Sequence, residues 1–516
     1  VIHISGVWGL GENLVQGTVT PDEFLVFKPT LRQGKNAILQ KRLGDKAKMM
    51  VYAEANEQSP VLNIDTPKDL QRQYVLTDKE IRQLATWCLL IEEHYGKPMD
   101  IEWAKDGITG KLFILQARPE TVQSRRNLQI LNEYQLIQKG VALTTGQAIG
   151  SKVAFGVARV LQSPKDAGRL KDGEIVVTDV TSPDWDPVLK NAAAIVTNKG
   201  GRTSHASIVA RELGVPAVVG CTNATEKIKD GELITVSCCE GKNGVVYRGE
   251  IPFKITEIDF STVQKPENTE VMLIVGDPDK AFQLSAYPND GVGLMRLEFI
   301  ITHSVQVHPM ALAKFDELQD EAVKKKIEEL TNHYPDKKQY FIQKLAQGIA
   351  TIAAAFYPKD VIVRMSDFKT NEYANLIGGA SFEPKEENPM LGFRGASRYY
   401  HDLYKDGFAL ECGAVKFVRE DMGLTNVKLM IPFCRTVDEA KKVIQVMVQN
   451  GLDRNIDEGL QIYMMAEIPS NVLLAEKFAA LFNGFSIGSN DLTQLTLGLD
   501  RDSAIVSPLF SEQNEA

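Results

Sequence analysis

Apolar runs of the kind found in buried β-strands alternate with helical stretches through the second half of the sequence. The runs are EVMLIVGD, GVGLMRLEF, DVIVRMSD, VKLMIPF, IYMMAEIP and GFSIGSND, and the later ones are separated by amphipathic segments such as RTVDEAKKVIQVMVQNG and NVLLAEKFAALF. Strands that alternate with helices pair in parallel, because each helix carries the chain back across the sheet. Residues 269–516 are therefore predicted to form a (β/α)8 barrel of the TIM type that lacks its last unit.

A chain of 516 residues is too long for one hydrophobic core, so we expect about three domains. Residues 1–125 mix β-type runs with one amphipathic helix, DKEIRQLATWCLLIEEHYG, and are predicted to be an α+β domain. Residues 126–143 are predicted to be a linker helix, and residues 144–250 a compact domain of short strands and turns. The polar stretch 251–268 is predicted to be a second linker, which precedes the barrel at 269–516.

Charge and hydropathy exclude several classes of partner. The chain has 58 basic and 67 acidic residues and no basic block, so we expect no nucleic acid partner. We also expect no membrane association, because no apolar stretch is long enough to span a bilayer and no signal peptide pattern is present. Six scattered cysteines without CxxC spacing indicate a reducing compartment, so a cytoplasmic location is predicted. The absence of an initiator Met indicates part of a longer protein.

Charged side chains close several of the apolar runs in the predicted barrel. In such barrels the chemistry gathers at the C-terminal ends of the strands. Arginine forks bind carboxylate or phosphate, and two carboxylates on neighbouring strands can hold a divalent cation. Salt bridges that contribute only stability are the alternative, but several such residues at consecutive strand ends favour a site for a small anion bound through a metal. The candidate residues are Arg296, Arg364, Arg394, Glu467, Asn490 and Asp491.

One histidine stands at the expected start of a helix, in the segment GGRTSHASIVAREL. Gly200 and Gly201 permit a tight turn, Thr203 or Ser204 can cap the helix, and His205 falls in its first turn. The positive end of the helix dipole favours an anion and disfavours imidazolium, so a neutral ring that accepts a phosphoryl group is chemically sensible there. The alternative is a histidine that only packs, and the local chemistry alone leaves both interpretations open.

Two long segments resemble signatures of the phosphoenolpyruvate-utilising enzymes. GGRTSHASIVARELGVPAVVG resembles the phosphohistidine signature of this family, and GFSIGSNDLTQLTLGLDRD resembles its second signature, on the barrel. The resemblance covers essentially the whole chain. It implies a multidomain α/β protein made of the C-terminal part of an ATP-grasp nucleotide domain, a swivelling phosphohistidine domain and the barrel. It also implies that His205 is phosphorylated, and that Thr203 matches a position at which a regulatory kinase or phosphorylase acts in relatives.

The resemblance also implies roles for the barrel residues. Arg296 and Arg364 would hold the phosphate and carboxylate region of the substrate, and Arg394 would bind the phosphoryl group. Glu467 and Asp491 would bind Mg²⁺. The pyruvate site would be lined by Gly488, Ser489 and Asn490.

The first domain resembles the family's nucleotide domain through MDIEWAKDG and KLFILQARPE, which match the pair of strands that face ATP. This match would assign Glu102 and Gln116 to the magnesium of ATP and Arg118 to its phosphates. The chain departs from the family in two respects. The N-terminal part of the nucleotide domain is absent, and the family's proton-donating cysteine lies in a motif beyond the end of this chain, so we name no proton donor.

The resemblance implies an enzyme that uses ATP to phosphorylate pyruvate. ATP would give its β-phosphoryl group to His205, the domain would swing to the barrel, and pyruvate would become phosphoenolpyruvate, with AMP and phosphate as the other products. A homodimer and a place in gluconeogenesis are implied as well. The alternatives are a dikinase that uses inorganic phosphate in place of water, the histidine-phosphorylated enzyme of sugar transport, an antibiotic phosphotransferase, and a non-catalytic relative. The enzyme of sugar transport lacks an ATP-grasp segment, and the antibiotic phosphotransferase lacks this barrel.

Overall fold

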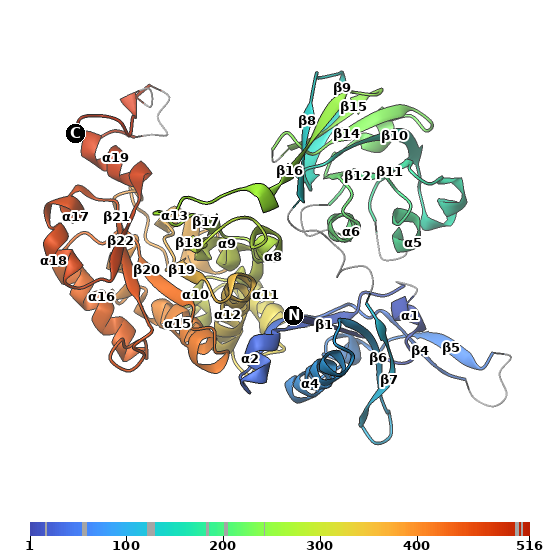
Figure 1. Ribbon diagram of the computed structural model, residues 1–516, viewed down its shortest axis with the longest axis horizontal. Helices are drawn as coiled ribbons and strands as arrows, with labels where there is room; N and C mark the ends of the chain where they lie inside the picture. Colours follow the sequence, from blue (N-terminus) through green and yellow to red (C-terminus); the bar gives the residue numbers. More distant parts are fainter. Residues whose placement is uncertain are drawn as a thin grey trace.

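The computed structural model describes residues 1–15, 18–53, 59–120, 130–181, 185–200, 205–241, 243–500, 505–506 and 509–516. Figure 1 shows three parts that follow the sequence, coloured blue, green, and yellow to red. None of the helices in these described stretches combines the length and the apolarity that crossing a bilayer requires.

The first part is built around a three-stranded antiparallel sheet and the long helix α4 (Asp78–Tyr95). Thr77 and Glu80 form a capping box at the start of this helix, and Gly96, the last residue of the predicted amphipathic segment, ends it in the left-handed conformation. Two exposed hairpins extend from this core (Figure 1). The strands are β1 (Ile2–Gly6), β2 (Asp22–Val26), β3 (Ile38–Arg42), β4 (Lys48–Tyr52), β5 (Val61–Asp65), β6 (Met99–Lys105) and β7 (Leu112–Pro119), and the short helices are α1 (Glu12–Val15), α2 (Lys28–Arg32) and α3 (Lys68–Gln71).

The predicted linker helix at 126–143 is wrong over the residues that the structure describes. Strand β8 (Ile130–Leu136) pairs antiparallel with β16 (Phe253–Asp259), so both predicted linkers contribute to one two-stranded ribbon. The rings of Tyr134 and Phe253 lie 6.1 Å apart across it. The local sequence is compatible with a helix, but the partner strand lies more than a hundred residues away in the chain. Long-range pairing therefore overrides the local pattern.

The second part is a closed barrel that contains both parallel and antiparallel strand pairs. Three helices lie between consecutive strands in the sequence from β11 to β14. Its strand order is β10-β11-β12-β13-β9-β15-β14, and the apolar faces of the strands point inward to form its core. This agrees with the predicted compact domain of short strands. The strands are β9 (Ala142–Ile149), β10 (Val153–Val160), β11 (Ile175–Thr178), β12 (Ala194–Thr197), β13 (Ala217–Val219), β14 (Leu233–Ser237) and β15 (Asn243–Arg248), and the helices are α5 (Asp186–Leu189), α6 (His205–Leu213) and α7 (Ala224–Lys227).

The third part contains a six-stranded sheet in which every neighbouring pair is parallel and the strand order follows the chain. Each of the six apolar runs is one strand, as predicted. The described sheet has six strands rather than the seven that a barrel lacking one unit would have, so its closure as an eight-stranded barrel stays a prediction. The strands are β17 (Met272–Val275), β18 (Gly291–Arg296), β19 (Asp360–Arg364), β20 (Val427–Ile431), β21 (Ile462–Ala466) and β22 (Gly484–Ile487).

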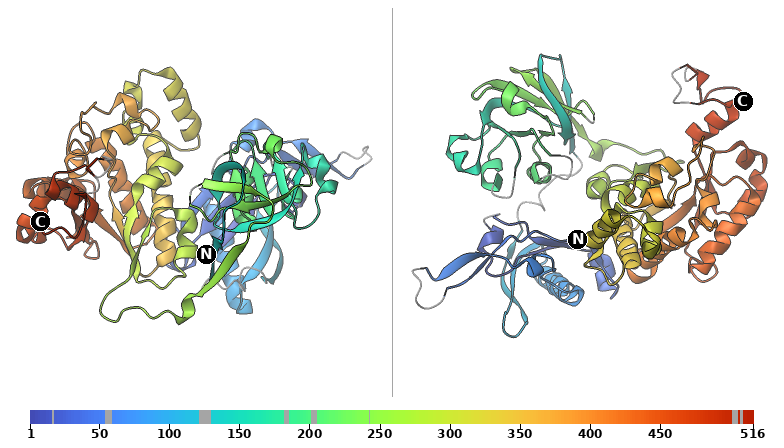
Figure 2. Two further views of the ribbon diagram at one scale, coloured as in Figure 1. Left: turned by 90° about the horizontal axis from the view of Figure 1, so that it is seen from above. Right: turned by 180° about the vertical axis from the view of Figure 1, so that it is seen from behind.

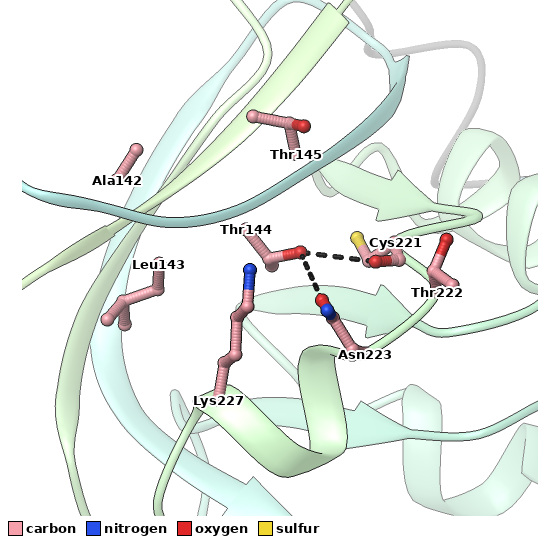
Figure 3. A pocket seen from close by; sticks show the side chains of 8 residues that line it. All are labelled: Ala142, Leu143, Thr144, Thr145, Cys221, Thr222, Asn223 and Lys227. Atoms are coloured by element: carbon pink, nitrogen blue, oxygen red, sulfur yellow. Dashed lines mark hydrogen bonds between the residues drawn. The ribbon is translucent and has the colours of Figure 1, made fainter.

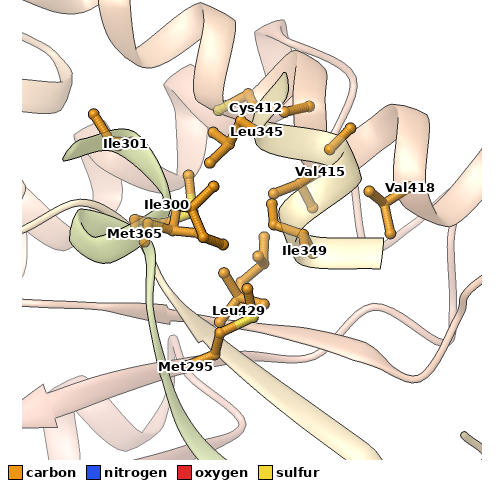
Figure 4. Packing of buried hydrophobic residues seen from close by; sticks show 14 of the residues in the cluster. Met295, Ile300, Ile301, Leu345, Ile349, Met365, Cys412, Val415, Val418 and Leu429 are labelled. Atoms are coloured by element: carbon orange, nitrogen blue, oxygen red, sulfur yellow. The ribbon is translucent and has the colours of Figure 1, made fainter. Parts of the chain in front are cut away.

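Helices cover this sheet and form the largest core of the protein. Figure 4 shows Met295 and Leu429 from the strands beside Leu345 and Ile349 of α12 and Val415 of α15, all of them buried. The helices are α8 (Ala281–Leu284), α9 (Leu297–Ile300), α10 (Pro309–Ala313), α11 (Glu321–Thr331), α12 (Lys337–Phe356), α13 (Thr370–Tyr373), α14 (Ala396–Tyr399), α15 (Lys405–Lys416), α16 (Val437–Gln449), α17 (Pro469–Leu473), α18 (Ala475–Ala479) and α19 (Ser489–Leu497).

The first and third parts share this core, although they are far apart in the sequence. Phe27 and Leu39 are buried in the same cluster as the residues of the parallel sheet. The backbone N–H of Asn36 donates to the carbonyl of Asp421 over 2.9 Å. Figure 2 shows the second part beside these two, reached through the β8–β16 ribbon. The described contacts therefore join the first and third parts into one platform.

Candidate active site

The C-terminal ends of the parallel strands bring the predicted arginines together. Arg296 ends β18 and Arg364 ends β19, and the two residues are direct partners in the strand register. Arg296 is exposed and forms no ion pair with another described residue, whereas the side chain of Arg364 is largely buried. Two guanidinium groups therefore lie side by side at this edge of the sheet. That of Arg364 is fixed in place, and that of Arg296 is available to bind an anion.

Arg364 is held by two acids that follow the strand ends. Its Nη2 donates to Glu298 Oε1 over 2.9 Å, and its Nη1 lies 3.5 Å from Asp367 Oδ2. Glu298 Oε1 also accepts the backbone N–H of Asp367 over 2.6 Å. Burial acts to lower the pKa of Arg364, but Glu298, Asp367 and Glu467 outweigh burial and raise this pKa above its usual value. The guanidinium is therefore a permanent, oriented charge.

Arg394 connects the acids of different strands. Its Nε and Nη2 donate to the two oxygens of Asp367 over 3.1 and 2.7 Å, and Nη2 also donates to Asp491 Oδ2 over 3.1 Å. The guanidinium carbon lies 4.1 Å from the centre of the Phe433 ring. Because Arg394 is only 3% exposed, its pairing with Asp367 and Asp491 takes place away from bulk water.

Glu467 follows strand β21 and lies against Gly488, which follows β22. Its Oε1 accepts the backbone N–H of Phe433 over 2.6 Å. A Cβ atom on Gly488 would lie 2.7 Å from Glu467 Oε2, so the absence of a side chain lets the carboxylate occupy this place. Asp491 is in the first turn of α19, buried like Glu467, while Asn490 is exposed and Ser489 is half-buried at the helix start. The predicted residues thus converge on one edge of the sheet.

The residues predicted for ATP also come together, on the hairpin of β6 and β7. Glu102 and Gln116 are direct cross-strand partners, and Arg118 is paired with Asp100. Side chains two residues apart on a strand share a face, so these residues lie on one face of the hairpin, and all of them are exposed. Arg118 Nε lies 3.5 Å from Asp100 Oδ2.

Helix α6 begins at His205, so this residue occupies the first turn as predicted. Ala206, Val209 and Ala210 of this helix are buried against the barrel of the second part. Gly200 has a φ of 115°, which favours glycine, while the rest of the expected turn lies outside the described residues. Thr203, the predicted regulatory residue, lies outside the described residues.

Comparison with known proteins agrees with this division of the chain. Residues 255–516 match the family described as PEP-utilising enzyme, PEP-binding domain. The chain belongs to the PEP-utilising enzymes. Residues 1–137 match the pyruvate phosphate dikinase AMP/ATP-binding domain, and residues 170–241 match the mobile domain of PEP-utilising enzymes. His205 therefore lies within the match to the mobile domain, and the strand-end residues lie within the match to the PEP-binding domain.

Relatives in several bacteria are similar over nearly all of the chain. The phosphoenolpyruvate synthase of Aquifex aeolicus is 52% identical over an alignment that covers 100% of this chain and 66% of that protein. The phosphoenolpyruvate synthase of Synechocystis is 53% identical, with coverage of 99% and 63%, and that of Escherichia coli is 53% identical, with coverage of 100% and 65%. The chain thus spans slightly less than two thirds of the length of these relatives.

Four residues of the site were not predicted from the sequence of this PEP-utilising enzyme. Glu298 and Asp367 hold Arg364, and Phe433 contacts both Arg394 and Glu467. The Asn471 side chain donates to the carbonyl of Cys434 over 2.7 Å and accepts the backbone N–H of Glu467 over 3.2 Å. Asp367 closes the run DVIVRMSD and Glu298 lies in GVGLMRLEF, so reading each strand end for partners of its arginine would have found both acids.

The second part, which includes the match to the mobile domain of the family, contains a cavity of about 330 Å³ that is lined by none of the predicted site residues. Figure 3 shows Lys227 extending along it towards Thr144 and Leu143. Thr144 Oγ1 donates to the carbonyl of Cys221 over 3.2 Å. The lining residues are Ala142, Leu143, Thr144, Thr145, Cys221, Thr222, Asn223 and Lys227.

Glu467 is expected to make the stability of the protein depend on pH. Burial, and then the charges of Asp367 and Asp491, raise the pKa of Glu467 from 4.5 to about 7. The folded state therefore holds this proton more tightly than the unfolded chain, and stability is lost as pH rises from about 4.5 through about 7. Over this range the unaltered protein should lose roughly 3 kcal/mol of unfolding free energy relative to the Glu467→Gln variant. Urea denaturation of both proteins at a series of pH values measures the difference, and parallel curves would contradict it.

Proposed function

We propose that this chain carries out the phosphoryl transfers of a phosphoenolpyruvate synthase: ATP, pyruvate and water become AMP, phosphoenolpyruvate and phosphate. The observation that carries the proposal is the cluster of Arg296, Arg364 and Arg394 with Glu467 and Asp491 at one edge of the parallel sheet. The names of the relatives, and the nucleotide and mobile domains that the chain matches, support the same activity.

The match of the chain to a nucleotide-binding domain, a mobile domain that includes His205 and a PEP-binding domain supports a two-step reaction. In the first step the β-phosphoryl group of ATP moves to an imidazole nitrogen of His205, AMP leaves, and water takes the γ-phosphoryl group as inorganic phosphate. Glu102, Gln116 and Arg118 are proposed to face the nucleotide. In the second step the His205 N–P bond breaks as an enolate oxygen of pyruvate, which has lost a methyl proton, forms the new O–P bond.

The strand-end cluster has the charges that the second step requires. Arg296 has no acidic partner among the described residues, so its fork is proposed to bind the incoming phosphoryl group. Arg364 lies beside it in the strand register and is proposed to orient the carboxylate of pyruvate. Fixed charges in a largely buried site stabilise developing negative charge without reorganising during the reaction. Gly488, Ser489 and Asn490 are proposed to border the pyruvate.

The acids of the cluster fit a divalent cation. Burial and the neighbouring charges of Asp367 and Asp491 raise the pKa of Glu467, and a cation would remove this repulsion. Glu467 and Asp491 are the proposed ligands of Mg²⁺, which would neutralise the charge of the enolate when bound. No group of three or more His, Cys, Asp or Glu residues suited to a metal is present in the described part of the chain, so substrate and water oxygens are proposed to complete the site.

The finer features implied by the resemblance are part of the same proposal. The first part would be the C-terminal portion of an ATP-grasp domain, and the third part a TIM-type barrel that is completed by further strands. We also propose a cytoplasmic homodimer in which a regulatory kinase or phosphorylase acts on Thr203. The nucleotide and mobile domains that the chain matches support the division into parts.

Labelled ATP tests the proposed reaction. The longest available form of the protein is incubated with Mg²⁺ and ATP labelled at the β or the γ position. We expect acid-labile label from the β position on the peptide that contains His205, its absence in the His205→Asn variant, and its discharge by pyruvate. The γ label is expected in free phosphate, whereas its recovery in pyrophosphate would indicate a dikinase that uses inorganic phosphate. A histidine that neither ATP nor phosphoenolpyruvate labels would contradict the proposal.

A further inference from the structure

Phe433 has a backbone conformation that phenylalanine rarely adopts. It follows strand β20 in the turn Pro432-Phe433-Cys434-Arg435, and its φ is 47°, in the left-handed region. A bulky side chain at positive φ is strained, and such strain persists only where the surrounding structure enforces it. The side chain is 2% exposed, so the turn cannot relax by turning the ring towards solvent.

Neighbouring elements hold this turn on several sides. Asn471 donates its side-chain amide to the carbonyl of Cys434, and Ser470 donates its hydroxyl to the carbonyl of Arg435 over 2.8 Å. On the other side the backbone N–H of Ala396 donates to the carbonyl of Pro432 over 3.0 Å. Gly395 also has a positive φ, of 58°, and a Cβ atom there would lie 2.5 Å from the Cβ of Phe433. The turn that contains Phe433 therefore packs directly against the Arg394–Gly395 segment, at a distance that leaves no room for a side chain at residue 395.

The strained conformation brings two parts of Phe433 to two charged groups of the site. Its backbone N–H reaches Glu467 Oε1 over 2.6 Å, and its ring lies 4.1 Å from the guanidinium carbon of Arg394. The electron-rich face of an aromatic ring attracts a cation and fixes the plane of a guanidinium. The same ring lies 4.8 Å from Arg435, but Arg435 is bonded to the carbonyl of Leu391 rather than to the acids of the site.

We infer that Phe433 is a positioning residue for phosphoenolpyruvate binding, because its ring fixes the orientation of Arg394 while its N–H holds Glu467. The inference rests on the proposed function, since it assigns Arg394 and Glu467 to the same bound substrate. The affinity for phosphoenolpyruvate should then depend on the electron density of the face of the Phe433 ring, and not only on the volume of the side chain. A residue that merely fills the core would affect stability without this dependence.

Two changes at Phe433 separate these effects. Phe433→Leu keeps a buried apolar side chain and removes the aromatic face, while a ring-fluorinated phenylalanine keeps the shape and weakens the attraction for a cation. The matched control is Phe478→Leu, which makes the same change at a fully buried phenylalanine of α18. The affinity for phosphoenolpyruvate in the presence of Mg²⁺ is measured by calorimetry on the full chain, and the melting temperature is recorded for each variant.

Phe433→Leu is expected to weaken phosphoenolpyruvate binding by about tenfold, and the fluorinated ring by about threefold, with no change in melting temperature for the latter. Phe478→Leu should lower the melting temperature and leave the affinity unchanged. Unaltered affinity in both Phe433 variants would overturn the inference while leaving the proposed function in place. If the unaltered protein binds no phosphoenolpyruvate, the proposed function fails, and the inference fails with it.

Discussion

Replacing Arg394 with methionine should lower the free energy of unfolding by about 3 to 5 kcal/mol and reduce phosphoenolpyruvate formation by about a thousandfold. The stability loss follows from burial. Arg394 is bonded to Asp367 and Asp491, and its removal takes a compensating charge from both acids, so that Asp367 keeps only its ion pair with Arg364 beside the acid Glu467. Methionine keeps much of the volume of arginine, so the expected effect is electrostatic rather than a packing defect.

A double-mutant cycle identifies the origin of this loss. Asp367→Asn removes one of the charges that Arg394 compensates, so adding it to Arg394→Met should recover part of the stability. Arg454→Met is the control, because Arg454 makes one exposed hydrogen bond, to Asn483, and should change stability by less than about 0.5 kcal/mol. Urea denaturation and the rate with pyruvate are measured for each protein. If the Arg394 and Arg454 variants lost the same unfolding free energy, the buried pairing of Arg394 with Asp367 and Asp491 would contribute no more to stability than an exposed hydrogen bond.

Six strands of the third part could be predicted because each is a short apolar run, although Ile274 of β17 and Ile487 of β22, at the two edges of the described sheet, are exposed. The positions of Arg296, Arg364 and Glu467 followed from these strands, since parallel strands end at a common edge. The helix that begins at His205 could also be predicted, because glycine and hydroxyl residues precede an amphipathic run. These inferences depend only on residues that are close in the sequence.

The features that sequence reasoning missed depend on partners far along the chain. Strand β8 is a strand because β16 pairs with it, and nothing within the segment itself specifies that partner. Asp367 itself closes a local apolar run, but its pairing with Arg394, which lies in a loop 27 residues later, has no local signal. The left-handed conformation of Phe433 is set by contacts from the segments that contain Gly395 and Asn471. Long-range contacts of this kind leave no local pattern.

Sharing of one core between the first and third parts limits where movement can occur. Because Phe27 and Leu39 are buried with residues of the parallel sheet, separating these two parts would expose apolar surface. The second part instead connects through the β8–β16 ribbon, whose residues are mostly exposed in β16. If His205 visits both proposed sites, the least costly movement is that of the second part against a fixed platform.

A second large effect is expected behind the site, at a carboxyl group that no solvent reaches. Glu411 of α15 is fully buried, and burial raises its pKa. Its Oε2 accepts the backbone N–H of Ser366 over 3.1 Å, and its Oε1 accepts the hydroxyls of Ser366 and Tyr404 over 2.6 and 2.7 Å. Ser366 lies between Arg364 and Asp367, so Glu411 holds the backbone from which both charged side chains extend.

Glu411→Leu should therefore cost about 3 to 6 kcal/mol of unfolding free energy, since three buried donors lose their acceptor at about 1 to 2 kcal/mol each. Glu411→Gln keeps one oxygen acceptor and mimics the protonated carboxyl that a raised pKa favours, so its cost should be about 1 kcal/mol. Asp406→Leu, at an exposed acid of the same helix, should have almost no effect. If the leucine variant at 411 is no less stable than the one at 406, the network does not support the site. If both the stability and the rate with pyruvate are lower in Glu411→Leu than in Glu411→Gln, then Glu411, which touches no substrate, positions the Arg364–Asp367 segment.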